Sequence, residues 1–271
     1  MAKNSPIEWT HHTFNPWWGC QKVSPACTHC YAEAWSKRIG LSVWGPSSDR
    51  RFFGDRHWRQ PLLWNDEAAR SGERRRVFCA SMADVFETRD DLATWRERLW
   101  SLIEATPRLD WLLLTKRPEN VSSIVPWGDA WPESVWLGTT VETQDWAAPR
   151  IAALLENKAR IHFLSCEPLL GLLDLSPWLP KLDWVIAGGE SGARARPMHP
   201  AWARALRDQC VDAGVAFHFK QWGSWAPARE GTGVRAVKVH FEAADATILA
   251  RVGKGAAGRQ LDGRTWSELP A

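Results

Sequence analysis

Three cysteines lie within eleven consecutive residues near the start of the chain: Cys20, Cys27 and Cys30. The last two form a C-x-x-C pair, a spacing that brings two sulfurs to one metal centre at the start of a helix. The six residues before Cys27 let the third sulfur approach from another side. Thiolates are soft ligands that select zinc or iron–sulfur clusters, and a helix N-terminus favours their negative charge. The spacing therefore predicts a metal centre.

The number of cysteine ligands helps to distinguish a zinc site from an iron–sulfur cluster. A structural zinc site usually has four ligands, commonly in two separated pairs, and the chain has no second C-x-x-C pair. Cys79, Cys166 and Cys210 occur singly, and we interpret them as buried small apolar residues. Three thiols without a fourth favour a [4Fe–4S] cluster with one iron left open. A zinc site completed by His29 or His12 remains the alternative.

Short apolar runs alternate with helical patterns along most of the chain. Nearly continuous apolarity is typical of strands covered on both faces. We expect strands at residues 7–10, 76–81, 110–115, 135–141, 160–165, 183–188 and 215–220. Helical patterns fall at residues 28–39, 90–104, 147–157 and 200–213. This alternation implies parallel βαβ units. The predicted fold class is α/β, a partial (β/α) barrel with six to seven mainly parallel strands.

The pattern changes near Ala226. A further strand is expected at residues 234–241, and the glycines at residues 253–259 indicate a loop. We therefore expect two parts, a partial barrel over residues 1–225 and a small C-terminal appendage over residues 226–271.

Polar or small residues follow the expected strands where each one ends. In parallel barrels, functional side chains gather at the C-terminal ends of the strands. The candidate site residues are Ser81, Met82, Asp84, Thr115, Lys116, Arg117, Glu142, Glu167, Gly188, Gly189 and Glu190.

The composition is that of a globular protein with a sizeable core, with 45% hydrophobic and 24% charged residues. No apolar run approaches the roughly 20 residues of a membrane span, and the N-terminus lacks the apolar segment of a signal peptide. We therefore expect a cytoplasmic protein without a membrane partner. Thiols stay reduced in that compartment, which favours metal ligation over disulfides.

Aromatic and basic residues raise the question of a nucleic-acid partner. The chain has 20 Trp and one Tyr. Tryptophans commonly fill cores, but they also stack on nucleobases. A basic stretch is interleaved with aromatics: Arg50, Arg51, Arg56, His57, Trp58 and Arg59. It is either a solvated face or a surface for phosphates and bases. A nucleic acid or nucleotide is the leading substrate class.

The segments N-P-W-W-G-C (residues 15–20) and S-P-A-C-T-H-C-Y-A (residues 24–32) resemble the three-cysteine-motif proteins of phages and bacteria, a radical-SAM-like family. The signals around residues 58–64, 188–190 and 257–263 are similar to that family too. The resemblance implies a [4Fe–4S] cluster on Cys20, Cys27 and Cys30, S-adenosyl-L-methionine (SAM) and an external one-electron donor. The general superfamily has three residues in the first gap and an aromatic before the third cysteine. This chain has six residues in the first gap, and its aromatic residue, Tyr31, follows the third cysteine.

The resemblance also implies a reaction. A reduced cluster passes one electron to the sulfonium of SAM, which leaves methionine and a 5′-deoxyadenosyl radical that abstracts a substrate hydrogen. The end of one strand would meet the methionine amino group, through Ser81, Met82 and Asp84. The end of the next would meet its carboxylate, through Thr115, Lys116 and Arg117.

Later strand ends would complete the SAM site. Glu142 would take the ribose hydroxyls, and Glu167 and Glu190 would face the same mouth. Gly188 and Gly189 would allow close backbone approach to the ligand. The sequence does not identify catalytic residues beyond the cofactor site. Two other functions stay open: a metal-stabilised nucleic-acid-binding module without catalysis, and aminocarboxypropyl transfer from SAM.

Overall fold

The computed structural model describes residues 2–228, 235–241 and 244–271. Its main sheet has eight strands in the order β1-β2-β5-β6-β7-β8-β9-β10. The seven strands from β2 onward are parallel, and β1 is antiparallel to β2. This is the α/β partial barrel that the alternation predicts. The strands are β1 (Ala2–Lys3), β2 (His12–Thr13), β5 (Arg75–Cys79), β6 (Leu109–Thr115), β7 (Val135–Thr140), β8 (Ile161–Cys166), β9 (Trp184–Gly188) and β10 (Ala216–Gln221).

The chain divides into two compact units. The first comprises Met1–Ser24, Ala32–Thr139 and Ala152–His162, and the second comprises Pro25–Tyr31, Thr140–Ile151 and Phe163–Ala271. Six of the expected strands lie within one or two residues of β5 to β10. The first strand is shifted, because residues 7–10 form a turn and His12 and Thr13 pair with Val77 and Phe78 of β5.

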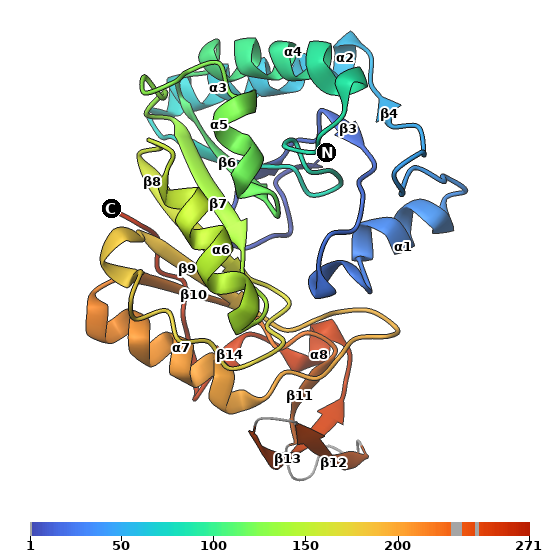
Figure 1. Cartoon of the computed structure of the whole chain (residues 1–271), viewed down its shortest axis with the longest axis vertical. Coiled ribbons are helices and arrows are strands. Elements are labelled where there is room, and N and C mark those ends of the chain that lie inside the picture. Colours follow the sequence, from blue (N-terminus) through green and yellow to red (C-terminus); the bar gives the residue numbers. More distant parts are fainter. Residues whose placement is uncertain (1, 229–234, 242–243) are drawn as a thin grey trace. The chain divides into compact units, whose positions relative to one another are not determined.

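In the first unit, the helices α3 (Gln60–Ser71) and α4 (Ala93–Glu104) lie side by side (Figure 1). Helix α4 confirms an expected element, whereas α3 was not predicted. Trp64 and Ala68 of α3 are buried one turn apart, and Pro61 lies in its first turn. Shorter elements of this unit are β3 (Trp17–Trp18), which pairs antiparallel with β4 (Arg51–Phe52), then α2 (Asp55–Trp58) and α5 (Val121–Ile124). Helix α1 (Tyr31–Arg38) begins directly after Cys30.

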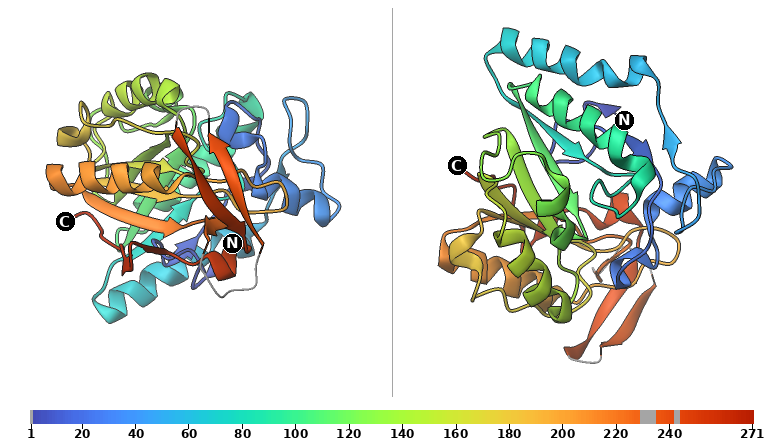
Figure 2. Two further views of the ribbon diagram at one scale, coloured as in Figure 1. Left: turned by 90° about the horizontal axis from the view of Figure 1, so that it is seen from below. Right: turned by 45° about the horizontal axis from the view of Figure 1, so that its top comes forward.

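In the second unit, α7 (Pro200–Ala213) runs beside β9 and β10 (Figure 1). Pro200 begins it and Gly214 ends it in a left-handed conformation, as their residue types predict. A three-stranded antiparallel sheet follows, in the order β11-β13-β12 (Figure 2). Its strands are β11 (Trp225–Pro227), β12 (Ala236–Phe241) and β13 (Ala244–Arg251). Helix α6 (Gln144–Leu155) has residues in both units.

The C-terminal segment reaches the edge of the main sheet. The backbone N–H of Phe219 in β10 donates to the carbonyl of Trp266 at 3.1 Å, and that of Glu268 donates to Phe217 at 3.2 Å. The tail thus covers a strand edge that would otherwise expose unpaired backbone groups. The loop expected at residues 253–259 contains one helical turn, α8 (Lys254–Ala257), and β14 (Gln260–Leu261) and β15 (Arg264–Thr265) follow. The expected boundary between residues 225 and 226 falls inside β11 and stays a prediction, and Val234 of the expected strand lies outside the described residues.

Candidate functional site

Cys20 lies in the first unit, in the segment that follows β3. The N–H of Gly19 donates to the carbonyl of Met82 at 3.0 Å, and the carbonyl of Cys20 accepts from Gly45 at 3.0 Å. A Cβ on Gly19 would lie 2.3 Å from the carbonyl oxygen of Val43, and its φ is +116°. Position 19 therefore requires glycine. These contacts fix the backbone that presents the Cys20 thiol.

The thiol of Cys20 faces a cation. Its Sγ lies 3.9 Å from Nη1 of Arg117. Burial, together with the charge of Asp84, raises the pKa of Cys20 to about 12, against the opposing effect of Arg117. A metal that binds here must therefore displace a firmly held proton.

Asp84 joins the ends of β5 and β6. Its Oδ1 accepts from the hydroxyl of Thr115 at 2.7 Å, and its Oδ2 accepts from the backbone N–H of Lys116 at 3.1 Å and from Nη1 of Arg117 at 2.9 Å. The second guanidinium nitrogen of Arg117 donates to the carbonyl of Gln21 at 2.8 Å. Burial lowers the pKa of Arg117, but the charges of Asp84 and Glu87 and the interaction with Cys20 together more than offset this, so Arg117 stays charged. Four of the predicted site residues, Asp84, Thr115, Lys116 and Arg117, thus form one hydrogen-bonded group beside Cys20.

Ser81 and Met82 are held by Asn15, which the sequence analysis did not single out. The side-chain oxygen of Asn15 accepts from the backbone N–H of Met82 at 2.7 Å, and its nitrogen donates to the Ser81 hydroxyl at 3.1 Å. Asn15 is fully buried. It opens the N-P-W-W-G-C segment, so its place in that motif was the available signal.

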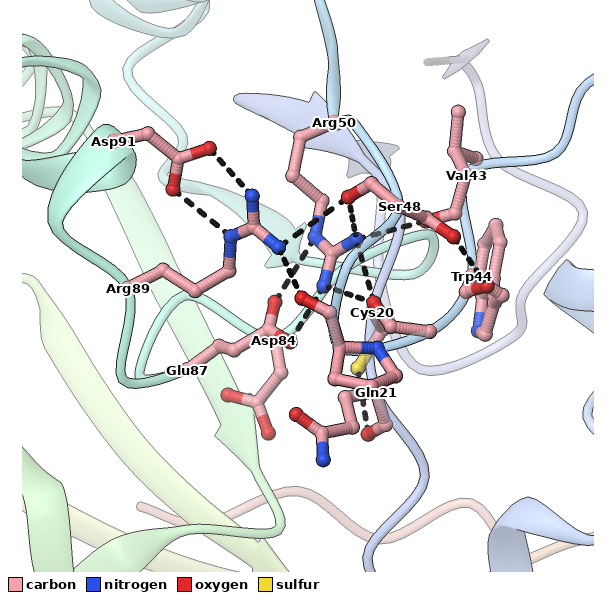
Figure 3. Close-up of polar contacts among 12 residues, drawn as sticks. Cys20, Gln21, Val43, Trp44, Ser48, Arg50, Asp84, Glu87, Arg89 and Asp91 are labelled. Atoms are coloured by element: carbon pink, nitrogen blue, oxygen red, sulfur yellow. Dashed lines mark hydrogen bonds and ion pairs between the residues drawn. The ribbon is translucent and has the colours of Figure 1, made fainter.

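A buried ion pair supports the loop next to Cys20 (Figure 3). Arg50 contacts Glu87 through Nη2–Oε1 at 2.6 Å and Nε–Oε2 at 3.1 Å, and both side chains are almost fully buried. Nη1 of Arg50 also donates to the carbonyls of Val43 at 3.0 Å and Ser48 at 2.8 Å. Arg50 is therefore a structural residue and not part of a basic surface.

In the second unit, Glu142 holds the segment that carries the other two cysteines. We call residues 25–30 the cysteine loop. Oε1 of Glu142 accepts from the N–H of Ala26 at 3.2 Å, and Oε2 accepts from Nη1 of Arg150 at 2.8 Å. The Glu142 side chain is fully buried. One carboxylate thus ties the cysteine loop to α6.

Glu190 and Arg196 hold the cysteine loop from a second side. Arg196 donates to Glu190 from its backbone N–H at 2.7 Å and from Nη2 at 2.7 Å, and Nη2 also donates to the carbonyl of Pro25 at 3.0 Å. Nδ1 of His29 lies 3.3 Å from Oε2 of Glu190. Burial raises the pKa of Glu190, but the hydrogen bonds from Arg196 and His29 outweigh it and hold that pKa below its usual range. Glu190 is therefore a carboxylate at neutral pH.

Glu167 and the two glycines lie at the ends of β8 and β9. Lys220 contacts both oxygens of Glu167, at 2.7 and 2.8 Å. A Cβ on Gly188 would meet the Glu167 side chain at an ordinary 3.5 Å. A Cβ on Gly189 would lie 2.0 Å from the carbonyl oxygen of Trp222. Gly189 is thus required by the close approach of two backbones within the protein.

The thiols of the motif differ from the others in exposure. Cys20, Cys27 and Cys30 are partly exposed, whereas Cys79, Cys166 and Cys210 are buried, as predicted. Cysteine thiolates are the ligands that hold iron–sulfur clusters, and the three thiols of the motif supply this donor type. Within residues 2–228, 235–241 and 244–271, no three His, Cys, Asp or Glu side chains are arranged as a ready-made metal site. Metal ligation is therefore a proposal that rests on the donor set.

His12 does not suit the zinc alternative. Its ring stacks on Trp64 with centroids 4.4 Å apart, and its Nδ1 accepts from the N–H of Asn4 at 3.3 Å. Burial lowers the pKa of His12 to about 4. His12 is a core residue of β2.

In the described ranges no helix is long and apolar enough to cross a membrane.

Comparison with known proteins places the chain in a family. Residues 4–270 match the family described as "Protein of unknown function (DUF5131)", and the chain belongs to that family. No curated protein matches it significantly. A solved structure of a cysteine-to-serine mutant of spore photoproduct lyase has 12% identity and a TM-score of 0.49, and the match covers 92% of this chain and 71% of that one. Another mutant of that lyase, with bound AdoMet and dinucleoside spore photoproduct, has 11% identity and a TM-score of 0.47 over 89% and 68% of the two chains.

Proposed function

We propose that this chain is a radical SAM enzyme whose [4Fe–4S] cluster is held by Cys20, Cys27 and Cys30. The carrying observation is the contrast among the six thiols: the three of the motif are partly exposed and the other three are buried. When bound, the cluster and SAM supply a one-electron reductive cleavage that starts radical chemistry on a substrate. An external one-electron reductant completes the electron balance.

The protein's own contribution is placement and charge. Arg117 puts a permanent positive charge beside Cys20, and Asp84 holds it there. Glu142, Glu190 and Arg196 hold the cysteine loop in the second unit. These contacts support the proposal because an oxygen-sensitive cluster with only three protein ligands depends on a well-fixed backbone.

We propose that residues at the C-terminal ends of the strands bind SAM. Ser81, Met82 and Asp84 are proposed for the amino group, and Thr115, Lys116 and Arg117 for the carboxylate. The second unit adds Glu142, Glu167, Gly188, Gly189 and Glu190. The substrate is proposed to be a nucleic acid or nucleotide. Aminocarboxypropyl transfer from SAM is the second candidate, because the same three cysteines serve it.

Anaerobic reconstitution with iron and sulfide tests the proposal. We expect a brown protein with the charge-transfer absorption of an iron–sulfur cluster and about four irons per chain. Reduction in the presence of SAM should yield 5′-deoxyadenosine. Methylthioadenosine in its place would indicate the transfer reaction.

Matched cysteine variants make the assignment specific. Cys20→Ala, Cys27→Ala and Cys30→Ala should each lose the cluster, whereas Cys210→Ala, a buried thiol outside the motif, should keep it. A colourless protein with one tightly bound zinc would refute the proposal, as would retention of the cluster in all three motif variants.

A further inference from the structure

A continuous row of aromatic rings lies on the first unit. Trp35 packs edge-on against Trp18 with centroids 4.9 Å apart, and Trp18 packs against Phe53 at 5.3 Å. Phe53 stacks on His57 at 4.2 Å with an angle of 11° between the rings. Trp35 is 39% exposed, and Trp18, Phe53 and His57 are partly exposed. The row therefore offers aromatic edges and faces to solvent over α1, β3, β4 and α2.

Arginines flank this row. The guanidinium of Arg51 lies 4.8 Å from the ring centroid of Trp18 and 5.6 Å from that of Phe53. Arg56 lines a hollow of about 600 Å³ together with Phe53, His57 and Gln60. Arg51 and Arg56 are both exposed. Among the residues that the structure describes, neither of them forms an ion pair with a carboxylate. Their charge is therefore available to an anionic partner.

The acidic residue in the hollow is already neutralised. Asp55 pairs with Arg98 at 2.6 Å, and this interaction lowers the pKa of Asp55. Burial lowers the pKa of His57, so its ring is neutral at pH 7 and acts as an aromatic surface. The surface is thus aromatic in the middle and positive at its edge.

The structure also separates the basic stretch of the sequence into two groups. Arg50 and Trp58 are buried and hold the fold, with 4% and 3% exposure. Arg51, Arg56 and Arg59 are exposed.

We propose that this aromatic–basic surface, formed by Trp18, Trp35, Arg51, Phe53, Arg56 and His57, binds a single-stranded nucleic acid. Unpaired bases present free faces for stacking, while the phosphates meet the arginines. In a duplex the base faces are stacked on one another, so only the phosphates could contact this surface. The inference deepens the proposed function by locating the substrate strand, and it rests on that function only for the statement that the strand is a substrate.

Binding of fluorescein-labelled oligonucleotides, measured by anisotropy, tests the proposal. Arms with single-stranded DNA, single-stranded RNA and duplex DNA of the same sequence identify the preferred polymer. Aerobically purified protein that spans residues 1–271 and carries no cluster suffices, so the result is independent of the iron–sulfur assignment. We expect tighter binding to one or both single strands than to the duplex.

Two variants with matched controls localise the binding. Phe53→Leu should weaken binding about fivefold or more, because it removes a stacking face and keeps an apolar side chain. Arg56→Gln should weaken binding and reduce the slope of log K against log salt by about 0.7. Trp131→Leu and Arg70→Gln, an aromatic and an exposed arginine elsewhere in the first unit, should leave affinity and slope unchanged.

Three outcomes would overturn the proposal. The first is no measurable binding to either single strand at low salt. The second is equal or tighter binding to the duplex, which would show that stacking plays no part. The third is equal weakening by test and control variants, which would place the strand elsewhere.

Discussion

Arg117 donates a hydrogen bond from Nη1 to Oδ2 of Asp84 at 2.9 Å, and the same nitrogen lies 3.9 Å from the sulfur of Cys20. Asp84 follows β5, and Arg117 follows β6, which is the neighbouring strand of the sheet. Parallel pairing brings the C-terminal ends of both strands to one edge, so residues 33 positions apart meet. The pair links the end of the sheet to the first cysteine of the motif.

Replacing Arg117 should change the reduction potential of a bound cluster. A positive charge near Cys20 favours the more negative, reduced cluster, so Arg117→Gln should lower the midpoint potential by on the order of 60 mV, a tenfold change in a one-electron equilibrium. Arg117→Lys keeps the charge and should lower it less. Anaerobic titration followed by electron paramagnetic resonance measures both. An unchanged potential in Arg117→Gln would show that the arginine does not act on the cluster.

Removing the Arg196 side chain should loosen the cysteine loop. Arg196→Gln loses the donor to Pro25 and most of the interaction with Glu190. In the cluster-free protein, Cys27 and Cys30 should react faster with Ellman's reagent than in the wild type. Arg194→Gln, an exposed arginine two residues away, is the control and should react at the wild-type rate. Identical rates in all three proteins would argue against a role for Arg196 in holding the loop.

Adjacent glycines should respond differently to a methyl group. Gly189→Ala would place its Cβ 2.0 Å from the carbonyl oxygen of Trp222, so the backbones must separate. We expect a loss on the order of 3 kcal/mol in unfolding free energy, measured by urea denaturation. Gly188→Ala meets the Glu167 side chain at an ordinary 3.5 Å and should unfold near the wild-type midpoint. Coinciding midpoints for the two variants would contradict this geometry.

Two neighbouring histidines should make stability depend on pH. Burial lowers the pKa of His11 and of His12 to about 4 in each case. In the unfolded chain both titrate near roughly 6.5, so the unfolded state binds protons first as the pH falls. The stabilisation is fully present above about pH 6.5 and is lost between there and about pH 4, by up to about 3 kcal/mol for each histidine.

The measurement is urea denaturation between pH 7.5 and pH 4.5, a range chosen to lie on both sides of roughly 6.5. His12→Asn should flatten the curve, although the variant loses the stacking on Trp64 and starts from a lower stability. A wild-type stability that does not change over this range would show that the histidines are not held neutral.

The central strands were predictable because a short run of apolar residues is enough to identify each of them. The runs that end at Thr115 and Gly188 are apolar almost throughout, as strands covered on both faces must be. Helix α3 was missed because its apolar residues do not all lie on the buried face: Leu62 and Leu63 are exposed, whereas Trp64 and Ala68 are buried. The first strand was misplaced because its two residues are defined by pairing with β5, which lies more than sixty residues away.

The partners of the polar residues were not predictable. Glu142 was expected to meet ribose hydroxyls, and in the structure its oxygens accept from Ala26 and Arg150. Whether it also contacts a ligand stays a prediction. Lys220 and Arg196 were not among the candidate site residues, although they pair with Glu167 and Glu190. A carboxylate at the end of a strand shows that a partner is needed, but the partner is chosen by distant segments.

The sequence by itself determined the cysteine motif, the parallel strand–helix alternation and the polar residues at the strand ends. All three depend on residue type and spacing over short stretches of chain. Only the tertiary structure decided that Arg117 faces Cys20, that Arg50 is buried against Glu87 and that Arg51 and Arg56 remain exposed. The physical reason is that burial and ion pairing are properties of the packed chain. A buried charged side chain pairs with a compensating group that is close in space, and that group can lie anywhere along the sequence.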